Sequence, residues 1–191
     1  ASDVYKRQAL NLAANTLGTR LGPRDEVVIT IMEHHSNLVP WQLVCERTGA
    51  KLRWFDITDD GQLDLDKAER EGLINEHTKV VSLALASNVL GTINPVQRIA
   101  QWAHQVGAVV VVDASQAVPQ MPVDVTELGA DLLAFTGHKM LGPTGIGILW
   151  GRYDLLDDLP PFLGGGEMIE VVRMTGSTSV SYTHLRAPET P

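Results

Sequence analysis

Cysteine and long apolar runs are scarce in this chain, and each shortage excludes a class of protein. Cys45 is the only cysteine among the 191 residues, which excludes an intrachain disulfide framework and a metal site built from several cysteines. The longest apolar strand candidate, 108–112, is far shorter than the roughly 18 to 20 apolar residues of a membrane span. The first residues also lack the pattern of a signal peptide. We therefore expect no membrane partner and a reducing, cytoplasmic location.

Basic residues and glycine fingerprints are scarce too. The chain has 15 Lys and Arg residues against 23 Asp and Glu, for a net charge of −8, and such an acidic balance disfavours binding to nucleic acid. No Gly-x-Gly-x-x-Gly follows a predicted strand, which argues against a nucleotide-binding α/β domain. His34 and His35 are adjacent and no further ligand recurs at helical spacing, so we expect no metal site.

What the chain does have is a regular alternation of apolar, strand-length segments with segments of helical period. This rhythm predicts an α/β fold, a mostly parallel sheet with helices on both faces. Asn94 and Pro95 are predicted to be the N-cap and first residue of one helix, and Gly49 and Gly107 to end two helices. The predicted strands are 27–31, 51–57, 80–85, 108–113, 132–136 and 146–150, and the predicted helical segments are 36–48, 63–72 and 95–107.

Polar and titratable residues follow four of the predicted strands. In a parallel sheet the ligand site lies beyond the carboxyl ends of the strands. We therefore expect a binding or catalytic site where these segments meet. The segments are Glu33-His34-His35, Ser87-Asn88, Asp113-Ala114-Ser115-Gln116 and Thr136-Gly137-His138-Lys139.

Lys139 and Asp113 are the main catalytic candidates. Lys139 follows an apolar strand, whereas we interpret the lysines at 6, 51, 67 and 79 as surface residues. Burial lowers the pKa of a lysine and makes it the amine nucleophile that an aldehyde cofactor requires. Asp113 ends a strand of four valines, where a carboxylate needs a cationic partner such as a pyridinium nitrogen. A surface-reaching lysine and a helix-capping aspartate are the plainer alternatives.

The other candidates carry weaker signals. His34 could stack on a flat ring or move a proton near neutral pH. Four hydrogen-bonding residues could serve a phenolate oxygen and a phosphate, although an ordinary structural role is the simpler interpretation of each. Cys45 lies on the apolar face of the predicted helix 36–48, so we interpret it as a packed residue rather than a nucleophile. The four hydrogen-bonding residues are Asn88, Gln116, Thr136 and His138.

Four motifs, in a fixed order, resemble a known family. They resemble the class V aminotransferase-fold enzymes, which use pyridoxal 5′-phosphate (PLP), and within them the SUF-type (group II) cysteine desulfurases and selenocysteine lyases. The resemblance runs from about residue 9 to residue 179, so we expect 9–179 to be part of the PLP-binding large domain. The motifs are EHHSNLVPW at 33–41, SNVLG at 87–91, VDASQA at 112–117 and TGHKMLGPTGIG at 136–147.

The resemblance implies a role for each matching residue. Lys139 would form the Schiff base with PLP, His34 would stack on the pyridine ring, and Asp113 would bind the ring nitrogen. Residues 164–168, Gly-Gly-Gly-Glu-Met, would approach the active site of a partner subunit in a homodimer. The remaining contacts would be made by Gln116 and Asn88 at the phenolate oxygen, with Asn88 also near the substrate carboxylate, and by Thr136 and His138 at the phosphate.

The implied reaction converts L-cysteine to alanine and leaves a persulfide on a separate cysteine, for transfer to a sulfur-acceptor protein in iron–sulfur cluster assembly. A selenocysteine lyase and a non-functional gene fragment remain alternatives. The family's catalytic cysteine, its carboxylate-binding arginine and its small domain have no counterpart here. The segments 1–8 and 181–191 depart from the family's pattern, and we interpret them as foreign ends. We therefore expect this chain alone to be inactive.

Overall fold

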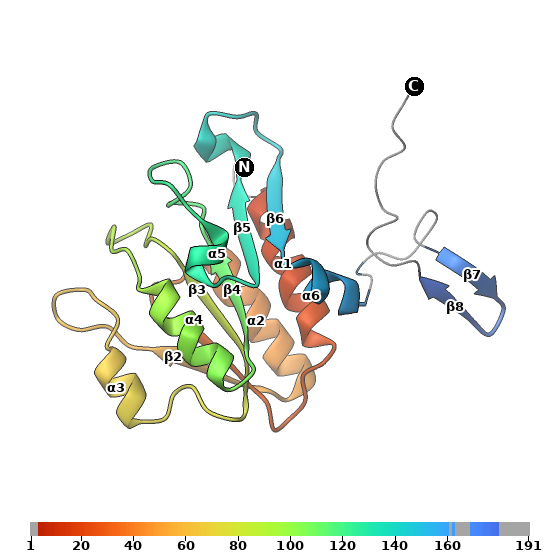
Figure 1. Ribbon diagram of the computed structural model, residues 1–191, viewed down its shortest axis with the longest axis horizontal. Coiled ribbons are helices and arrows are strands. Elements are labelled where there is room, and N and C mark those ends of the chain that lie inside the picture. The colour runs from red at the N-terminus through yellow and green to blue at the C-terminus, as the bar shows by residue number, and fades with distance from the viewer. Residues whose placement is uncertain (1–3, 161, 163–168, 180–191) are drawn as a thin grey trace. The chain divides into compact units, whose positions relative to one another are not determined.

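Six strands form the sheet of the first of two units, residues 1–151 and 152–191, into which the chain divides. The computed structural model describes residues 4–160, 162 and 169–179. The strand order is β2-β1-β3-β4-β5-β6 (Figure 1). The first five strands are parallel and β6 is antiparallel to β5, which confirms the predicted, mostly parallel sheet. The strands are β1 (Glu26–Thr30), β2 (Lys51–Phe55), β3 (Thr78–Ala84), β4 (Val109–Asp113), β5 (Leu132–Thr136) and β6 (Gly147–Gly151).

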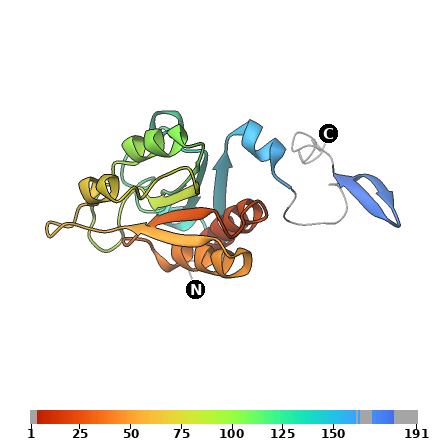
Figure 2. The same ribbon diagram turned by 90° about the horizontal axis from the view of Figure 1, so that it is seen from below.

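Helices cover both faces of this sheet, as predicted. Helices α1 (Val4–Gly18) and α2 (His35–Thr48) lie on one face, and α3 (Leu65–Arg70) and α4 (Val96–Gln105) lie on the other (Figure 2). A short helix, α5 (Val125–Leu128), packs beside α4. Because both faces are covered, the central strands are buried along most of their length instead of alternating between buried and exposed residues. All five residues of β1 are buried, for example.

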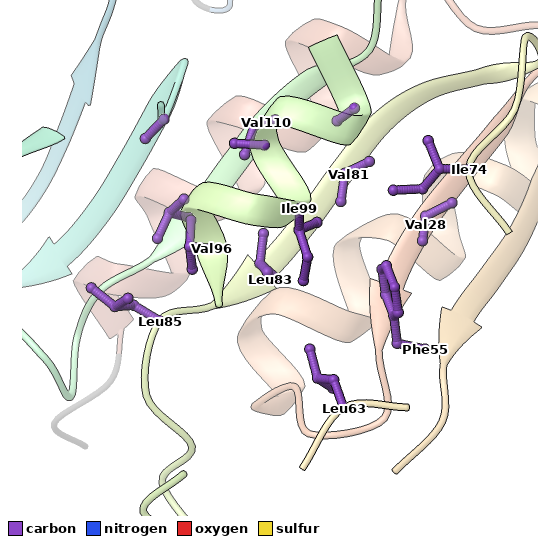
Figure 3. Close-up of a cluster of buried hydrophobic side chains, with 14 of the residues drawn as sticks. Val28, Phe55, Leu63, Ile74, Val81, Leu83, Leu85, Val96, Ile99 and Val110 are labelled. Carbon is purple, nitrogen blue, oxygen red and sulfur yellow. The ribbon is translucent and has the colours of Figure 1, made fainter. Parts of the chain in front are cut away.

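The core between the sheet and α4 shows how the valine-rich strands are used. Val110 of β4 and Val28 of β1 pack in one cluster with Ile99 and Val96 of α4 (Figure 3). Phe55, at the end of β2, closes the cluster towards the edge of the sheet. The strands are thereby held as a rigid platform, so that the residues after their carboxyl ends have fixed positions.

Two boundaries test the predicted turn chemistry. Gly49 was predicted to end the helix 36–48, and it ends α2 in the left-handed conformation, with φ of 77°. The start of α4 was predicted wrongly, since the helix begins at Val96 with Pro95 as its N-cap residue. The side chain of Asn94 donates to the carbonyl of Ala84 at 2.8 Å, so it completes the end of β3 and does not cap the helix.

Helix α1 was not predicted, and it begins inside the segment 1–8 that differs from the family's pattern. Its buried face is formed by Leu10, Ala13, Ala14 and Leu17. It packs against α2, β5 and β6. Lys6, in the first turns of the same helix, is also buried. The polar residues of these first turns obscured the helical period in the sequence.

The second unit contains α6 (Tyr153–Asp158) and a hairpin of β7 (Ile169–Arg173) and β8 (Gly176–Ser179). The segment 164–168, for which we predicted a role at a partner's active site, lies outside the described residues. Within the part of the chain that the structure describes, no helix has both the length and the apolar character that a membrane crossing needs.

Candidate active site

The parallel strands bring the predicted segments to one edge of the sheet. Asp113 is in register with Ala84 on β3 and with Ala134 on β5, and Thr136 ends β5 two residues further on. β1 lies between β2 and β3 in the sheet, so the strand order reverses there. Such a reversal opens a crevice at the carboxyl ends of the strands. The fold therefore places the candidate residues where an α/β sheet binds its ligand.

Asp113 is a buried carboxylate with both oxygens engaged. The side chain is 4% exposed; its Oδ1 accepts the Ser115 N–H at 3.0 Å, and its Oδ2 lies 2.9 Å from Nζ of Lys6. The need for a cation at this position was predicted correctly. The interpretation of Lys6 as a surface lysine was wrong, because its side chain is 2% exposed. Beside this pair the Ser115 hydroxyl is buried and has no hydrogen-bond partner among the described residues.

Lys139 lies in a short 3-10 helix, η1 (Gly137–Met140), directly after β5. Its side chain is half-buried, as is that of His138. Nδ1 of His138 is 2.7 Å from the hydroxyl of Thr136, so these two predicted phosphate ligands hold each other. The strand end thus orients three of the predicted residues within a single turn.

A tight loop fixes this turn. The Gly142 N–H donates to the Gly137 carbonyl at 3.0 Å, and the Gly137 N–H donates to the Ile146 carbonyl at 2.9 Å. Leu141 takes the left-handed conformation, with φ of 60°, which a branched side chain adopts only when its surroundings impose it. A Cβ at Gly142 would lie 2.9 Å from the Gly137 carbonyl oxygen. Glycine is therefore required where the loop returns on itself.

His34 is oriented by the start of α2. Its Nδ1 accepts the Ser36 N–H at 3.1 Å and lies 2.8 Å from the Ser36 hydroxyl. Because Nδ1 accepts, the neutral ring carries its proton on Nε2. The rings of His34 and His35 are 6.0 Å apart and inclined by 48°. The two histidines thus have different orientations, as expected for adjacent residues, and His34 has a fixed ring plane.

Glu33 belongs to one of the predicted strand-end segments, but the sequence reasoning gave it no role of its own. Its Oε1 accepts from the Thr30 hydroxyl at 2.6 Å and from the Ala84 N–H at 2.9 Å, and its Oε2 accepts from the Asn37 amide at 2.6 Å. Burial raises the pKa of this carboxyl to about 7, against the effect of these hydrogen bonds, and the negative charge of Asp113 adds to the rise. Glu33 therefore joins the ends of β1 and β3 to α2, next to Asp113.

Asn88 and Gln116 line an open pocket of about 550 Å³ beside this edge. The loop 86–91 forms one wall, and Ala117, Gln120 and Met121 form part of the other. Asp113 and Lys139 do not line this pocket, so it accounts for only two of the predicted residues. It lies beyond the ends of β3 and β4, at the edge of the sheet that also carries the residues following β5.

Cys45 lies away from this edge, on the buried side of α2. Burial raises the pKa of its thiol to about 11, so the interpretation of Cys45 as a packed residue is confirmed. In the described ranges, no group of three or more His, Cys, Asp and Glu side chains has an arrangement suited to a metal ion.

Comparison with known families agrees with this architecture. Residues 7–188 match the family model described as aminotransferase class-V, and the chain belongs to the class V aminotransferase family. It is 60% identical over 189 residues to a probable cysteine desulfurase from Streptomyces coelicolor, covering 96% of this chain and 45% of that protein. A cysteine desulfurase from Haloferax volcanii is 50% identical over 172 residues, or 90% of this chain and 40% of that one. The predicted family is thus confirmed.

Solved structures give the same result for the fold. The cysteine desulfurase CsdA from Escherichia coli superposes with a TM-score of 0.87 at 38% identity, over 97% of this chain and 46% of that chain. An apo cysteine desulfurase from Thermococcus onnurineus NA1 superposes with a TM-score of 0.84 at 40% identity, over 94% and 44%. This chain therefore spans less than half the length of these relatives.

Proposed function

We propose that this chain is the cofactor-binding part of a PLP-dependent cysteine desulfurase. Its relatives carry that name, and one observation supports the proposal most directly. Asp113 is a buried carboxylate that holds a cation on Oδ2, at the same sheet edge as the turn of Lys139. A buried acid beside a lysine-bearing turn is the pair that a pyridine aldehyde requires.

The residues at this edge fit PLP. The Lys6 ammonium on Asp113 Oδ2 is a stand-in for a protonated ring nitrogen, because both are N–H cations that a carboxylate accepts. The unpartnered Ser115 hydroxyl offers a further polar contact beside it. When bound, PLP supplies an electron sink for a carbanion at the α-carbon of the substrate.

The chain's own residues would divide the work as follows. Nζ of Lys139 would hold the cofactor and, once a substrate amine replaces it, would move a proton at the substrate α-carbon. Asp113 would keep the ring nitrogen protonated. His34 would lie against the ring, with its plane fixed by the Ser36 contacts to Nδ1. These three roles place one residue at each of three strand ends.

The remaining residues would hold the polar groups of the cofactor and substrate. Gln116 and Asn88 share one pocket, so both amides can serve the phenolate oxygen, and Asn88 can also reach a substrate carboxylate. Thr136 and His138 would bind the phosphate, and their mutual contact of 2.7 Å keeps both in one orientation. The L-cysteine substrate, a homodimer, a sulfur-acceptor protein, iron–sulfur cluster assembly and a cytoplasmic location belong to the same proposal.

Cys45 does not provide the sulfur nucleophile in this proposal. With a pKa of about 11, roughly one thiol in 10,000 is ionised at pH 7, and the thiolate is the reactive form. Its burial on α2 also keeps it away from the sheet edge. The persulfide would therefore form on a cysteine outside this chain, and the chain alone would release no alanine from L-cysteine.

Borohydride trapping tests the proposal. PLP is added to the full chain, reduced with borohydride and located by peptide mapping, in the wild type and in Lys139→Ala and Lys79→Ala variants. Lys79 is the control because it is exposed. We expect the label on Lys139 in the wild type and in Lys79→Ala, and its loss in Lys139→Ala. Label on Lys6 or another lysine, or no label at all, would refute the assignment.

A further inference from the structure

The ion pair between Lys6 and Asp113 differs from an ordinary surface salt bridge. Nζ of Lys6 lies 2.9 Å from Oδ2 of Asp113, and the two side chains are 2% and 4% exposed. The side chains of the Arg53–Glu26 pair are 28% and 11% exposed. A charge with so little contact with water depends on its partner for stabilisation. Lys6 and Asp113 therefore form a buried ion pair in which each charge depends on the other, and this pair links α1 to the end of β4.

The geometry of Asp113 leaves one oxygen for a cation. Oδ1 accepts the Ser115 N–H at 3.0 Å, a contact within one turn of the chain, so this oxygen is held by the local backbone. Oδ2 is the oxygen that Lys6 contacts. A second cation that approaches Asp113 at Oδ2 therefore meets the oxygen that Lys6 already holds.

We infer that Lys6 competes with the cofactor ring for Oδ2 of Asp113, an inference that rests on the proposed PLP site. Lys6 and a ring-nitrogen cation would approach the same oxygen, and two positive charges at that distance repel each other. Binding of the ring nitrogen as a cation thus requires the Lys6 ammonium to leave Oδ2. In this chain, the contact between Lys6 and Asp113 therefore opposes binding of the cofactor.

The expected change in the affinity for PLP follows from the fraction of molecules in which Lys6 holds Asp113. A ligand that binds only the competent fraction of a protein has its apparent affinity reduced by that fraction. If Lys6 holds Asp113 in about nine molecules of ten, the apparent Kd for PLP rises roughly tenfold. A cofactor analogue that does not need Asp113 escapes this effect, so the change in the ratio of the two dissociation constants between the wild type and a Lys6 variant reports on Lys6.

The test measures two ligands on three forms of the full chain. The ligands are PLP and its carbocyclic analogue, in which a C–H replaces the ring nitrogen. The proteins are the wild type, Lys6→Met and Arg7→Met, the last being a matched control because Arg7 is the next residue of α1 and is exposed. Binding is followed by quenching of tryptophan fluorescence. We expect PLP to bind Lys6→Met about tenfold more tightly than the wild type or Arg7→Met, with no difference for the analogue.

The outcomes separate this inference from the proposed function. Equal PLP affinity of Lys6→Met and the wild type would overturn the competition and leave the proposed site standing. Failure of every form to bind either ligand would overturn both. Lys6→Gln replaces Lys6→Met if the latter does not fold.

Discussion

Buried carboxylates at the amino ends and at the carboxyl ends of the strands, here called the amino edge and the carboxyl edge of the sheet, have different surroundings and opposite pKa shifts. At the amino end of β1, burial acts to raise the pKa of Glu26, but hydrogen bonds from Asn75 and Arg53 outweigh it and lower the pKa below its ordinary value. Just beyond the carboxyl end of the same strand, burial dominates and raises the pKa of Glu33 to about 7. At the amino ends of the strands, hydrogen bonds therefore stabilise the charged form of Glu26. At their carboxyl ends, burial destabilises the charged form of Glu33.

The difference teaches where function is located in this fold. Arg53 neutralises Glu26 and bonds to the carbonyls of Gly72 and Leu73, so the amino edge is a stable junction of strands and loops. At the carboxyl edge Glu33, Asp113 and Lys6 are all buried, with two acids and one cation close together. Ionisable groups are kept in such costly surroundings mainly at functional sites. Three experiments test this contrast.

The largest effect is expected from breaking the buried pair. In Asp113→Asn the Lys6 ammonium loses its charged partner, and removing one partner of a buried ion pair costs about 3 to 5 kcal/mol. We expect that loss in the free energy of unfolding of the chain without cofactor, measured in urea. The double variant Lys6→Met/Asp113→Asn should regain a large part of it, because no charge is then left unpaired. Additive losses in the double variant would show that the two side chains are not coupled.

The second experiment uses the opposite pKa shifts of Glu33 and Glu26. The folded-state pKa of Glu33 is raised from 4.5 to about 7, so between these values the folded state binds the proton more tightly. The contribution of Glu33 to stability is therefore lost as pH rises from 4.5 to 7, by about 3 kcal/mol at 1.36 kcal/mol per pKa unit. For Glu26, whose pKa is lowered, stability is instead lost as pH falls.

The measurement is the unfolding free energy from about pH 3 to about pH 8 for the wild type, Glu33→Gln and Glu26→Gln, because the Glu26 effect lies mainly below its ordinary pKa of 4.5. Relative to the wild type, Glu33→Gln should gain stability as pH rises from 4.5 to about 7, and Glu26→Gln should lose stability as pH rises from below 4.5 to just above it. Curves with the same slope for the two variants would show that the edges do not differ in the way described.

Sequence reasoning predicted the cation requirement of Asp113 but assigned the wrong role to Lys6. A carboxylate after four valines needs a cation wherever that cation comes from, so the requirement follows from local sequence. Which cation meets it depends on α1 packing beside β5, and that is a tertiary contact. The polar first turns of α1 gave no helical period that could have indicated it.

Two other features were accessible to the same reasoning. Glu33 follows β1 after only two apolar residues, Ile31 and Met32, so the argument used for Asp113 could have identified it. Ten residues separate β5 from β6, and a parallel connection needs a dozen or more. The antiparallel direction of β6 could therefore have been predicted from loop length, whereas the strand positions were predicted from apolar runs alone.

The smallest effect concerns the loop that carries Lys139. In Gly142→Ala the new methyl would lie 2.9 Å from the Gly137 carbonyl oxygen, and forced overpacking costs about 1 to 3 kcal/mol. Gly22→Ala is the matched control, since the nearest atom to its added methyl is a side-chain oxygen of Asp25 at 3.8 Å, and a change within about 0.5 kcal/mol is expected there. The unfolding free energy of both variants measures the strain. If that strain moves the turn, Gly142→Ala should also trap less PLP on Lys139 than Gly22→Ala does. Equal trapping together with a stability loss would mean that the loop yields between Gly142 and Ile146 while η1 stays in place.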